Sequence, residues 1–449
     1  MYTRLVSSVL FPVHERIKRH DSVRRLRELE RTQWWTPAGI ERLREQRLAR
    51  FVRHAAERVP YYRELFARHG LRPGDVRTVA DLQRLPLLDK ATIRGERARL
   101  RADDASDLTP FSTGGSSGEP LTFDLGRERL SHDVAAKWRA TRWWGVDIGD
   151  PEAVIWGSPI ELGGQDRLKA VRDRLLRTRL YPAFAMAPAD MDRFLADIRR
   201  RRPRMLFGYP SALSLLAGHA EAAGVTLEDA GLRVAFVTGE RLYPDQAERI
   251  RRVFGCPVAN GYGGRDAGFI AHECPEHGLH LSAEDIVVEI VDRAGRPLPC
   301  GEPGEVVVTH TATSGFPFIR YRTGDIAALD DRACACGRGL PLLRSVEGRD
   351  TDFVVAPDGT RMHGLALIYV LREQPGVERF KIVQESPARV RVMVVPGAQW
   401  TEAVARDIRR GIRERMGGDV GVEVECTDAI AAEGSGKYRY VVSHAGVAA

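Results

Sequence analysis

Apolar residues recur at helical spacing through the first part of the chain. Leu48, Phe51 and Val52 follow the three- and four-residue steps of one helix face, which is typical of an amphipathic helix. We therefore predict that residues 1–70 are helical. We expect residues 1–100 to cover one side of a sheet domain.

Short apolar runs then alternate with helical patterns. Most of these runs end at a glycine-containing turn, as the run before Thr238-Gly239-Glu240 does. Strand, loop and helix in repetition predict a mostly parallel sheet, with ligands expected at the carboxyl ends of its strands. The predicted strands are 121–123, 153–156, 205–207, 234–237 and 256–260, and the predicted helices are 127–144, 212–223 and 243–254.

The pattern changes near residue 281, where apolar runs are joined by Gly/Pro turns, as in a β-rich unit. A joint is predicted at Gly348-Arg349-Asp350-Thr351-Asp352, before a smaller α+β pattern. We therefore predict an α/β fold of two domains, 1–347 and 348–449. The first would contain a sheet core at 101–280 and a β-rich part at 281–347, with strands at 286–291 and 304–309. The second would contain helices at 364–373 and 401–416 and strands at 379–384, 389–395 and 421–426.

Composition narrows the class of protein. The chain of 449 residues is 43% hydrophobic and 29% charged, as in globular proteins of two or three domains. Its formal charge of +7 is spread among acidic residues, which argues against nucleic acid as a partner. No apolar run reaches the ~18 residues of a membrane span. The run at 5–13 is short and lacks a cleavage site, so we expect a packing or surface segment and a cytoplasmic location.

A run of hydroxyls and glycines stands out at 112–120, Ser-Thr-Gly-Gly-Ser-Ser-Gly-Glu-Pro. Glycines let several N–H groups point to one spot, and hydroxyls add donors there, so the run could cradle phosphate oxygens. It could also be a surface linker. It lacks the Gly-Lys-Ser/Thr ending of a P-loop. Lysine is rare against 62 arginines, so each of the six lysines, Lys437 among them, could mark a site that needs a compact ammonium.

Two cysteine clusters suggest a metal site. Cys334 and Cys336 lie in a polar loop, and Cys274 precedes His277 and His280. Three thiolates and one imidazole are ligands that zinc takes in a closed tetrahedral site. The prediction is a structural zinc at Cys274, His280, Cys334 and Cys336, with His277 as the alternative imidazole ligand. The alternative is four unlinked residues near a surface turn.

The order of these motifs resembles that of the adenylate-forming enzymes, in particular the phenylacetate–CoA ligase branch and its relatives in capsule and exopolysaccharide gene clusters. The resemblance covers nearly the whole chain and includes a zinc site in that branch. It rests on the 112–118 loop, 238–240, 260–263, 321–325, Gly348-Arg349, Gly436-Lys437, the 59–62 turn and the 271–280 stretch.

The resemblance implies that a carboxylic acid attacks ATP to give acyl-AMP and pyrophosphate, and that CoA then displaces AMP. It places Mg²⁺ at Asp266, where the family usually has Glu, and the catalytic ammonium at Lys437 on a mobile C-terminal domain. Glu119 also departs from the lysine often found there, which puts phosphate binding in doubt. The implied nucleotide-binding residues are Ser112, Thr113, Gly114, Gly115, Ser116, Ser117, Gly118, Gly239, Glu240, Tyr262, Asp325 and Arg349.

Trp156, Tyr209, Pro210 and Gly263 would line the acid pocket by their position at the strand ends, although each could equally be packing. Two further functions stay open. The acyl group could pass to an amine or hydroxyl of a polysaccharide or metabolite precursor, or the chain could be a non-catalytic, zinc-stabilised nucleotide-binding protein. A homodimer is an option, since no pattern fixes the oligomeric state.

Overall fold

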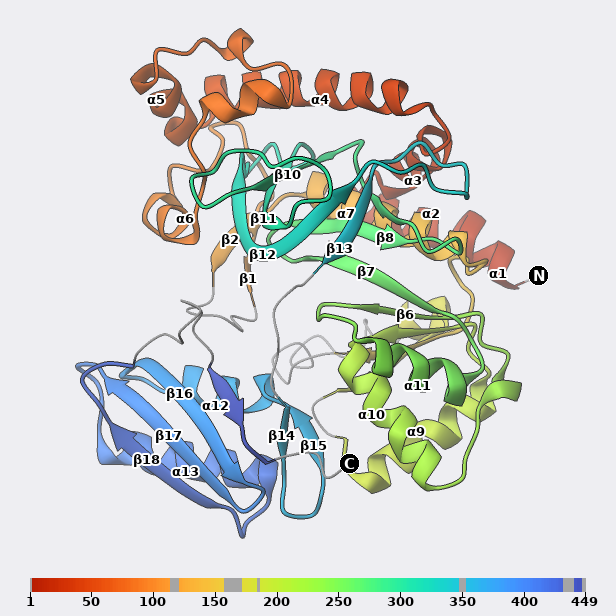
Figure 1. Cartoon of the computed structure of the whole chain (residues 1–449), viewed down its shortest axis with the longest axis vertical. Coiled ribbons are helices and arrows are strands. Elements are labelled where there is room, and N and C mark those ends of the chain that lie inside the picture. Colours follow the sequence, from red (N-terminus) through yellow and green to blue (C-terminus); the bar gives the residue numbers. More distant parts are fainter. Residues whose placement is uncertain are drawn as a thin grey trace.

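The computed structural model describes residues 2–113, 121–156, 172–183, 186–346, 353–430 and 440–445. A long mixed sheet runs through the larger part of the molecule, with helices on both faces, and a smaller sheet of the C-terminal residues lies apart from it (Figure 1). The predicted α/β class with a second, smaller α+β unit is confirmed.

The large sheet has eleven strands in the order β10-β11-β12-β13-β9-β8-β7-β6-β5-β3-β4. Its parallel half consists of five strands, which form because short runs of apolar residues are buried on both faces. Every residue of β5 and β6 is buried. These strands are β4 (Thr178–Pro182), β3 (Glu152–Trp156), β5 (Met205–Gly208), β6 (Val234–Thr238) and β7 (Val258–Gly264).

Helices cover both faces of the parallel half. One face packs against α9, α10 and α11, whose apolar residues share a cluster with β3, β5 and β6. The other face packs against α7 through Ala140, which contacts the cluster of Met205, Phe207 and Phe236. These helices are α7 (Arg127–Trp143), α9 (Pro188–Arg201), α10 (Pro210–Ala222) and α11 (Pro244–Phe254).

The remaining strands of the sheet pair antiparallel. The predicted end of a strand at Asn260 is wrong, because β7 continues through four more residues and pairs with β8. Glycine makes this possible, since a Cβ at Gly263 would lie 2.1 Å from the carbonyl oxygen of Gly268. The antiparallel strands are β8 (Gly268–Glu273), β9 (Leu279–Leu281), β10 (Ile286–Val291), β11 (Gly304–His310), β12 (Tyr321–Asp330) and β13 (Leu342–Val346).

The predicted N-terminal helices are present and cover the antiparallel half (Figure 1). Leu48, Phe51 and Val52 are buried against strand residues such as Val288 and Val306. The long helix starts where the Thr36 hydroxyl accepts from the backbone N–H of Gly39, an N-cap. The helices and short turns are α1 (Tyr2–Leu5), the π-helix η1 (Val6–Leu10), α2 (Phe11–Ile17), α3 (Ser22–Thr32), α4 (Pro37–Arg58), α5 (Pro60–Arg68), η2 (Pro73–Asp75), η3 (Ala80–Arg84), α6 (Lys90–Glu96) and, later in the chain, η5 (Glu228–Ala230).

The C-terminal residues form their own core around a four-stranded sheet of order β18-β17-β16-β19. Residues 347–352 lie outside the described ranges, so the predicted joint and domain boundary stay predictions. Among the described helices, none is long and apolar enough to cross a membrane. The elements are β14 (Phe353–Val355), β15 (Arg361–His363), α12 (Leu365–Arg372), β16 (Val377–Ser386), β17 (Arg389–Pro396), α13 (Glu402–Met416), β18 (Gly421–Cys426) and β19 (Val441–Ser443).

Candidate functional site

The carboxyl ends of the parallel strands bring three predicted residues together. Trp156 ends β3 and Tyr209 follows β5, and their rings stack at 4.1 Å between centroids. Gly239 follows β6 with φ +85°, and a Cβ there would lie 3.1 Å from the Tyr209 ring and 3.2 Å from Trp156. The glycine therefore lets the backbone approach the aromatic stack, and its left-handed φ disfavours any other residue.

Pro210 and Glu240 lie next to this aromatic stack, at the carboxyl ends of the parallel strands. Pro210 is buried at the start of α10, where proline suits the first helical turn. Burial, and secondarily the negative charge of Glu240, raise the pKa of Tyr209. The phenol therefore stays protonated and able to donate a hydrogen bond at neutral pH.

The structure also brings Tyr262 and Asp325 into contact. The Tyr262 hydroxyl donates to the Asp325 Oδ2 atom at 3.0 Å, joining β7 to β12 across 63 residues of sequence. Burial, with the adjacent carboxylate as a second cause, raises the pKa of Tyr262 well above its ordinary value. A carboxylate has about four lone-pair positions. Asp325 can therefore accept further hydrogen bonds from a bound hydroxyl.

Asp266 lies between β7 and β8, close enough to Tyr262 for its charge to contribute to the raised pKa of that phenol. Its Oδ2 atom accepts from the Tyr321 hydroxyl at 2.5 Å, and its Oδ1 atom accepts from the backbone N–H of Ala267 at 3.1 Å. Both bonds fix the carboxylate and leave lone pairs on each oxygen. A half-buried, oriented carboxylate is the type of ligand that Mg²⁺ accepts, so the residue fits that ion.

The sequence reasoning missed Arg129, a 1% exposed arginine of α7. Its Nε atom donates to both carboxylate oxygens of Asp133 at 3.0 Å. Its other nitrogens donate to the carbonyl oxygens of Arg265, at 3.2 Å, and Asp266, at 3.5 Å. Arg129 therefore holds the turn that carries Asp266. Its sequence pattern is that of a solvated helix face, so only tertiary contacts reveal it.

The strands that flank the hydroxyl and glycine run pair antiparallel: β1 (Thr109–Ser112) with β2 (Thr122–Leu125). The base of this run is fixed, because Thr113 and Leu121 exchange bonds: the Thr113 N–H donates to Leu121 at 3.0 Å, and the Leu121 N–H to the Thr113 hydroxyl at 2.9 Å. The other predicted phosphate ligands, residues 114–118, lie outside the described ranges, as do Arg349 and Lys437.

The four predicted metal ligands converge. The sulfur atoms of Cys274, Cys334 and Cys336 and an imidazole nitrogen of His280 all lie within 4.8 Å of one another. The Cys274 and Cys334 sulfurs are 3.6 Å apart, close to the roughly 3.8 Å edge of a tetrahedron with Zn–S bonds of about 2.3 Å. His277, the alternative imidazole, instead pairs with Glu273 at 2.9 Å.

The surroundings of this Cys/His cluster suit a closed metal site. The His280 Nδ1 atom is 3.3 Å from the carbonyl of Leu340, which leaves Nε2 for a metal. Burial lowers the pKa of His280 to about 4, so the imidazole is neutral. Burial raises the pKa of Cys274 to about 12, a cost that a bound cation would offset. Trp143 packs edge-on to His280 at 5.6 Å.

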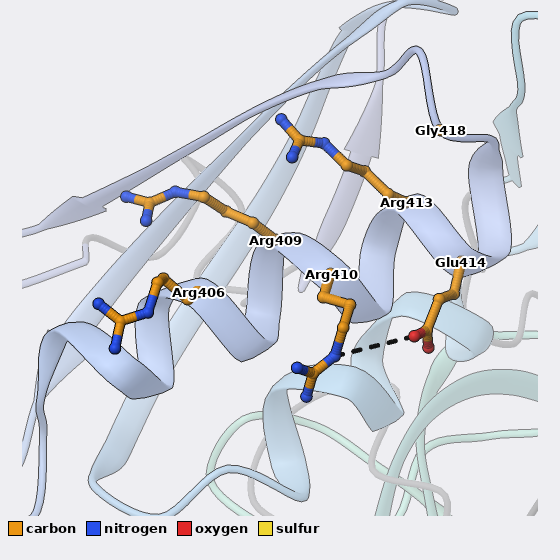
Figure 2. Close-up of a pocket in the computed structure, with 6 residues that line it drawn as sticks. All are labelled: Arg406, Arg409, Arg410, Arg413, Glu414 and Gly418. Carbon is orange, nitrogen blue, oxygen red and sulfur yellow. Dashed lines mark ion pairs between the residues drawn. The ribbon is translucent and has the colours of Figure 1, made fainter.

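A pocket on the C-terminal domain lies along α13 (Figure 2). Several of its arginines are paired within this domain: Arg409 with Glu402 at 2.9 Å and Arg410 with Asp407 at 2.7 Å. This pattern is typical of a solvated helix face. The pocket is lined by Arg406, Arg409, Arg410, Arg413, Glu414 and Gly418.

Comparisons with known proteins agree with this geometry. Residues 177–315 match the family model of the AMP-binding enzymes, and residues 354–444 match that of the CapK C-terminal domain. Phenylacetate-coenzyme A ligase of Thermus thermophilus is 27% identical over 70% of this chain and 72% of its own. Protein CapK of Staphylococcus aureus is 20% identical over 95% and 92%.

A solved structure shares the fold. 2-Hydroxyisobutyryl-CoA ligase, in complex with 2-HIB-AMP and CoA in the thioesterification state, superposes with a TM-score of 0.65 at 23% identity, over 92% of this chain and 91% of that one. Together with the family models, these likenesses define an adenylate-forming enzyme with AMP-binding motifs. The relatives that cover most of the chain are phenylacetate-coenzyme A ligases and protein CapK, so the chain is similar to AMP-forming ligases of the phenylacetate–CoA ligase type.

Proposed function

We propose that this ligase activates an organic carboxylic acid with ATP and transfers the acyl group to CoA. An acid oxygen would attack the α-phosphorus, whose bond to the pyrophosphate oxygen breaks. The CoA sulfur would then attack the acyl carbon, and AMP would leave. The observation that carries the proposal is the Tyr262–Asp325 contact at 3.0 Å, which unites two nucleotide motifs that are distant in sequence.

The roles of the residues follow from their chemistry. The Tyr262 ring would stack on adenine, with Gly239 and Glu240 beside the base, and Asp325 would accept the ribose hydroxyls. The hydroxyls and N–H groups of 112–118 would bind the terminal phosphates. These assignments come from the resemblance, and the described contacts of Tyr262 and Asp325 are compatible with them.

Two groups would act on the reacting phosphate. Lys437 would neutralise the negative charges of acid and α-phosphate as they approach. Mg²⁺, held by Asp266, would supply electrostatic stabilisation of phosphate charge. Arg129 supports this role, because it fixes the backbone that carries Asp266. Arg349, which lies in the predicted joint before the C-terminal domain, would bind the nucleotide.

The acid pocket is proposed at the aromatic stack. Trp156 and Tyr209 present parallel ring faces, 18° apart. Flat rings pack well against aryl or short branched acids. Gly263 and Pro210 lie at the same sheet edge. We therefore expect aryl acids to be better substrates than long, flexible fatty acids.

We further propose structural zinc at the Cys/His cluster. Four protein ligands fill a tetrahedral site and leave no position for substrate. Zinc there would link β8 and β9, through Cys274 and His280, to the loop before β13 that carries Cys334 and Cys336. Its role would be to hold the antiparallel half together.

The experiment is an ATP–pyrophosphate exchange screen over a panel of aryl, short-chain and long-chain acids. Exchange that depends on one class of acid would support adenylation, and its absence for every acid with zinc-loaded protein would contradict it. Product analysis with CoA then tests the acceptor. The second acceptor, an amine or hydroxyl on a saccharide precursor, would instead give acyl transfer to that acceptor but not to CoA.

A further inference from the structure

Large apolar side chains are exposed in a row along the N-terminal helices α1, η1 and α2. They recur every three or four residues, so they share one face of the helix. The exposed fraction of these residues rises along the row, from 40% to 77%. We call this row the N-terminal stripe: Tyr2 (40%), Leu5 (46%), Val9 (47%), Val13 (52%) and Ile17 (77%).

The opposite face of the same segment is fixed on the body of the protein. Val6 and Phe11 are buried in a cluster with residues of α3 and α7. A Cβ at Gly149 would lie 2.4 Å from the Val6 Cβ atom, so the fit there is close. Glu15 is 3% exposed and accepts from the Ser22 hydroxyl at 2.5 Å. The stripe therefore points outward because the inner face is locked.

The segment that carries the stripe, residues 2–20, is positively charged. Arg4, Arg16, Lys18 and Arg19 are exposed in the same segment, whereas Glu15, the sole acidic residue of 2–20, is buried. The surface continues onto a helical turn at 172–176, where the Tyr2 hydroxyl donates to the Leu175 carbonyl at 2.9 Å. Leu175 is itself 46% exposed.

We propose that the N-terminal stripe binds the surface of an anionic lipid bilayer, lying in the plane of the interface. Apolar residues on an outward face flanked by lysine and arginine are the chemistry of an interfacial helix, which buries its apolar side among the acyl chains and pairs its cations with headgroups. The inner face fixes the orientation of the enzyme on the membrane.

A second copy of the chain fits this surface less well. A two-fold interface brings the same patch of each copy together. The cations that flank one stripe would then face those that flank the other. The one acidic residue of the segment, Glu15, is already buried and could not offset them. Like charges at an interface oppose association, whereas anionic headgroups neutralise the same residues.

The test is sedimentation of the full chain with vesicles. One vesicle is phosphatidylcholine alone, and the other is an equal mixture of phosphatidylcholine and phosphatidylglycerol. We expect binding to the anionic vesicle, weakened by salt because the headgroup attraction is screened. The variant Leu5→Gln/Val9→Gln/Val13→Gln/Ile17→Gln should bind on the order of 100-fold less, since it loses most of the buried apolar area. The variant Arg16→Gln/Lys18→Gln/Arg19→Gln should lose the preference for phosphatidylglycerol.

A matched control replaces exposed aromatic residues outside the stripe. Trp34 and Trp35 are 54% and 39% exposed, and Trp34→Gln/Trp35→Gln should bind vesicles as the wild type does. Thermal unfolding of each variant establishes that it is folded. The proposal is overturned if the wild type fails to bind anionic vesicles, or if the stripe variant binds equally well. A wild-type dimer that the stripe variant converts to a monomer, without vesicle binding, would overturn it in favour of a second copy.

Discussion

The Cys/His cluster and the proposed nucleotide edge, which contains Tyr262, Asp325 and Asp266, are two sites on one sheet. They are built differently. The cluster is closed, because its four ligand atoms already lie within 4.8 Å of one another. The nucleotide edge is open: Tyr262 on β7, Asp325 on β12 and Asp266 between β7 and β8 are fixed by neighbours but retain capacity to bind. With the proposed roles, the comparison sets a site whose geometry would serve stability against one whose geometry would serve a reversibly bound ligand.

The largest effect is expected at the closed site. Cys334→Ser should lose zinc and several kcal/mol of stability, because metal binding to structural zinc sites is linked to folding, with apparent values of about 10 kcal/mol or more in small domains. Metal analysis and thermal unfolding measure both. Cys426→Ser, at an exposed cysteine, is the control. Wild-type protein purified without any zinc would contradict the structural role.

At the open site, Lys437→Ala should lower adenylation on the order of 10²–10³-fold while leaving zinc content and stability unchanged, since one transition-state charge contact is lost. Pyrophosphate release measures this half-reaction. The variant should still transfer acyl from preformed acyl-AMP, because the charge is no longer needed there. Lys381→Ala, on β16, is the matched control. Normal adenylation by the Lys437 variant would remove this residue from the site.

A smaller effect is expected at the ribose. Asp325→Ala should weaken AMP and ATP binding together by about tenfold to a hundredfold, because a hydrogen bond to a charged group contributes roughly 1.5–3 kcal/mol. Calorimetry with AMP measures the loss. Asp330→Ala, on the same strand and paired with Arg332, should leave it unchanged. Equal AMP affinities of the Asp325 and Asp330 variants would contradict the proposed role of Asp325 in ribose binding.

The smallest effect is expected in the layer behind the nucleotide edge. His310 is fully buried beside Arg129, and burial lowers its pKa well below the ordinary value. Its neutral form is therefore favoured in the folded state, so its contribution to stability is present above about pH 6.5 and is lost as the pH falls toward the folded pKa. His310→Asn should make stability less dependent on pH between 7 and 5 in urea unfolding. An unchanged pH slope would exclude His310 as a source of acid sensitivity.

Local patterns predicted most elements of the fold. The runs at 205–207 and 234–237 are strands, and the helical spacing before residue 70 is helix, because burial of apolar faces decides both. The pattern failed at β7, where glycines that usually break a strand instead allow it to pair closely with β8. A glycine within a strand pattern can mark either a break in the strand or a close approach of another backbone. Only the position of the partner strand decides between the two.

The candidate site, like the fold, has some features that local sequence patterns predict and others that only distant partners determine. The two Cys/His motifs predicted which four side chains converge in the Cys/His cluster, because metal-ligand chemistry is local to each short motif, while zinc itself stays a prediction. Arg129 could not be predicted, since its partners near Asp266 lie 136 and 137 residues away. The buried pair of Arg139 and Glu284, 2.7 Å apart and both 0% exposed, was equally hidden. Long-range pairing of charged residues leaves no periodic signal in the sequence.

One contact of the Cys/His cluster has an optical consequence. Trp143 packs 5.6 Å from His280, and the Arg338 guanidinium lies 4.5 Å from its ring. Indole emission responds to charge and to quenchers at such distances. Exchange of the proposed zinc for a paramagnetic cobalt ion should therefore quench the fluorescence of this tryptophan, and the protein would then carry a native reporter of which metal it holds.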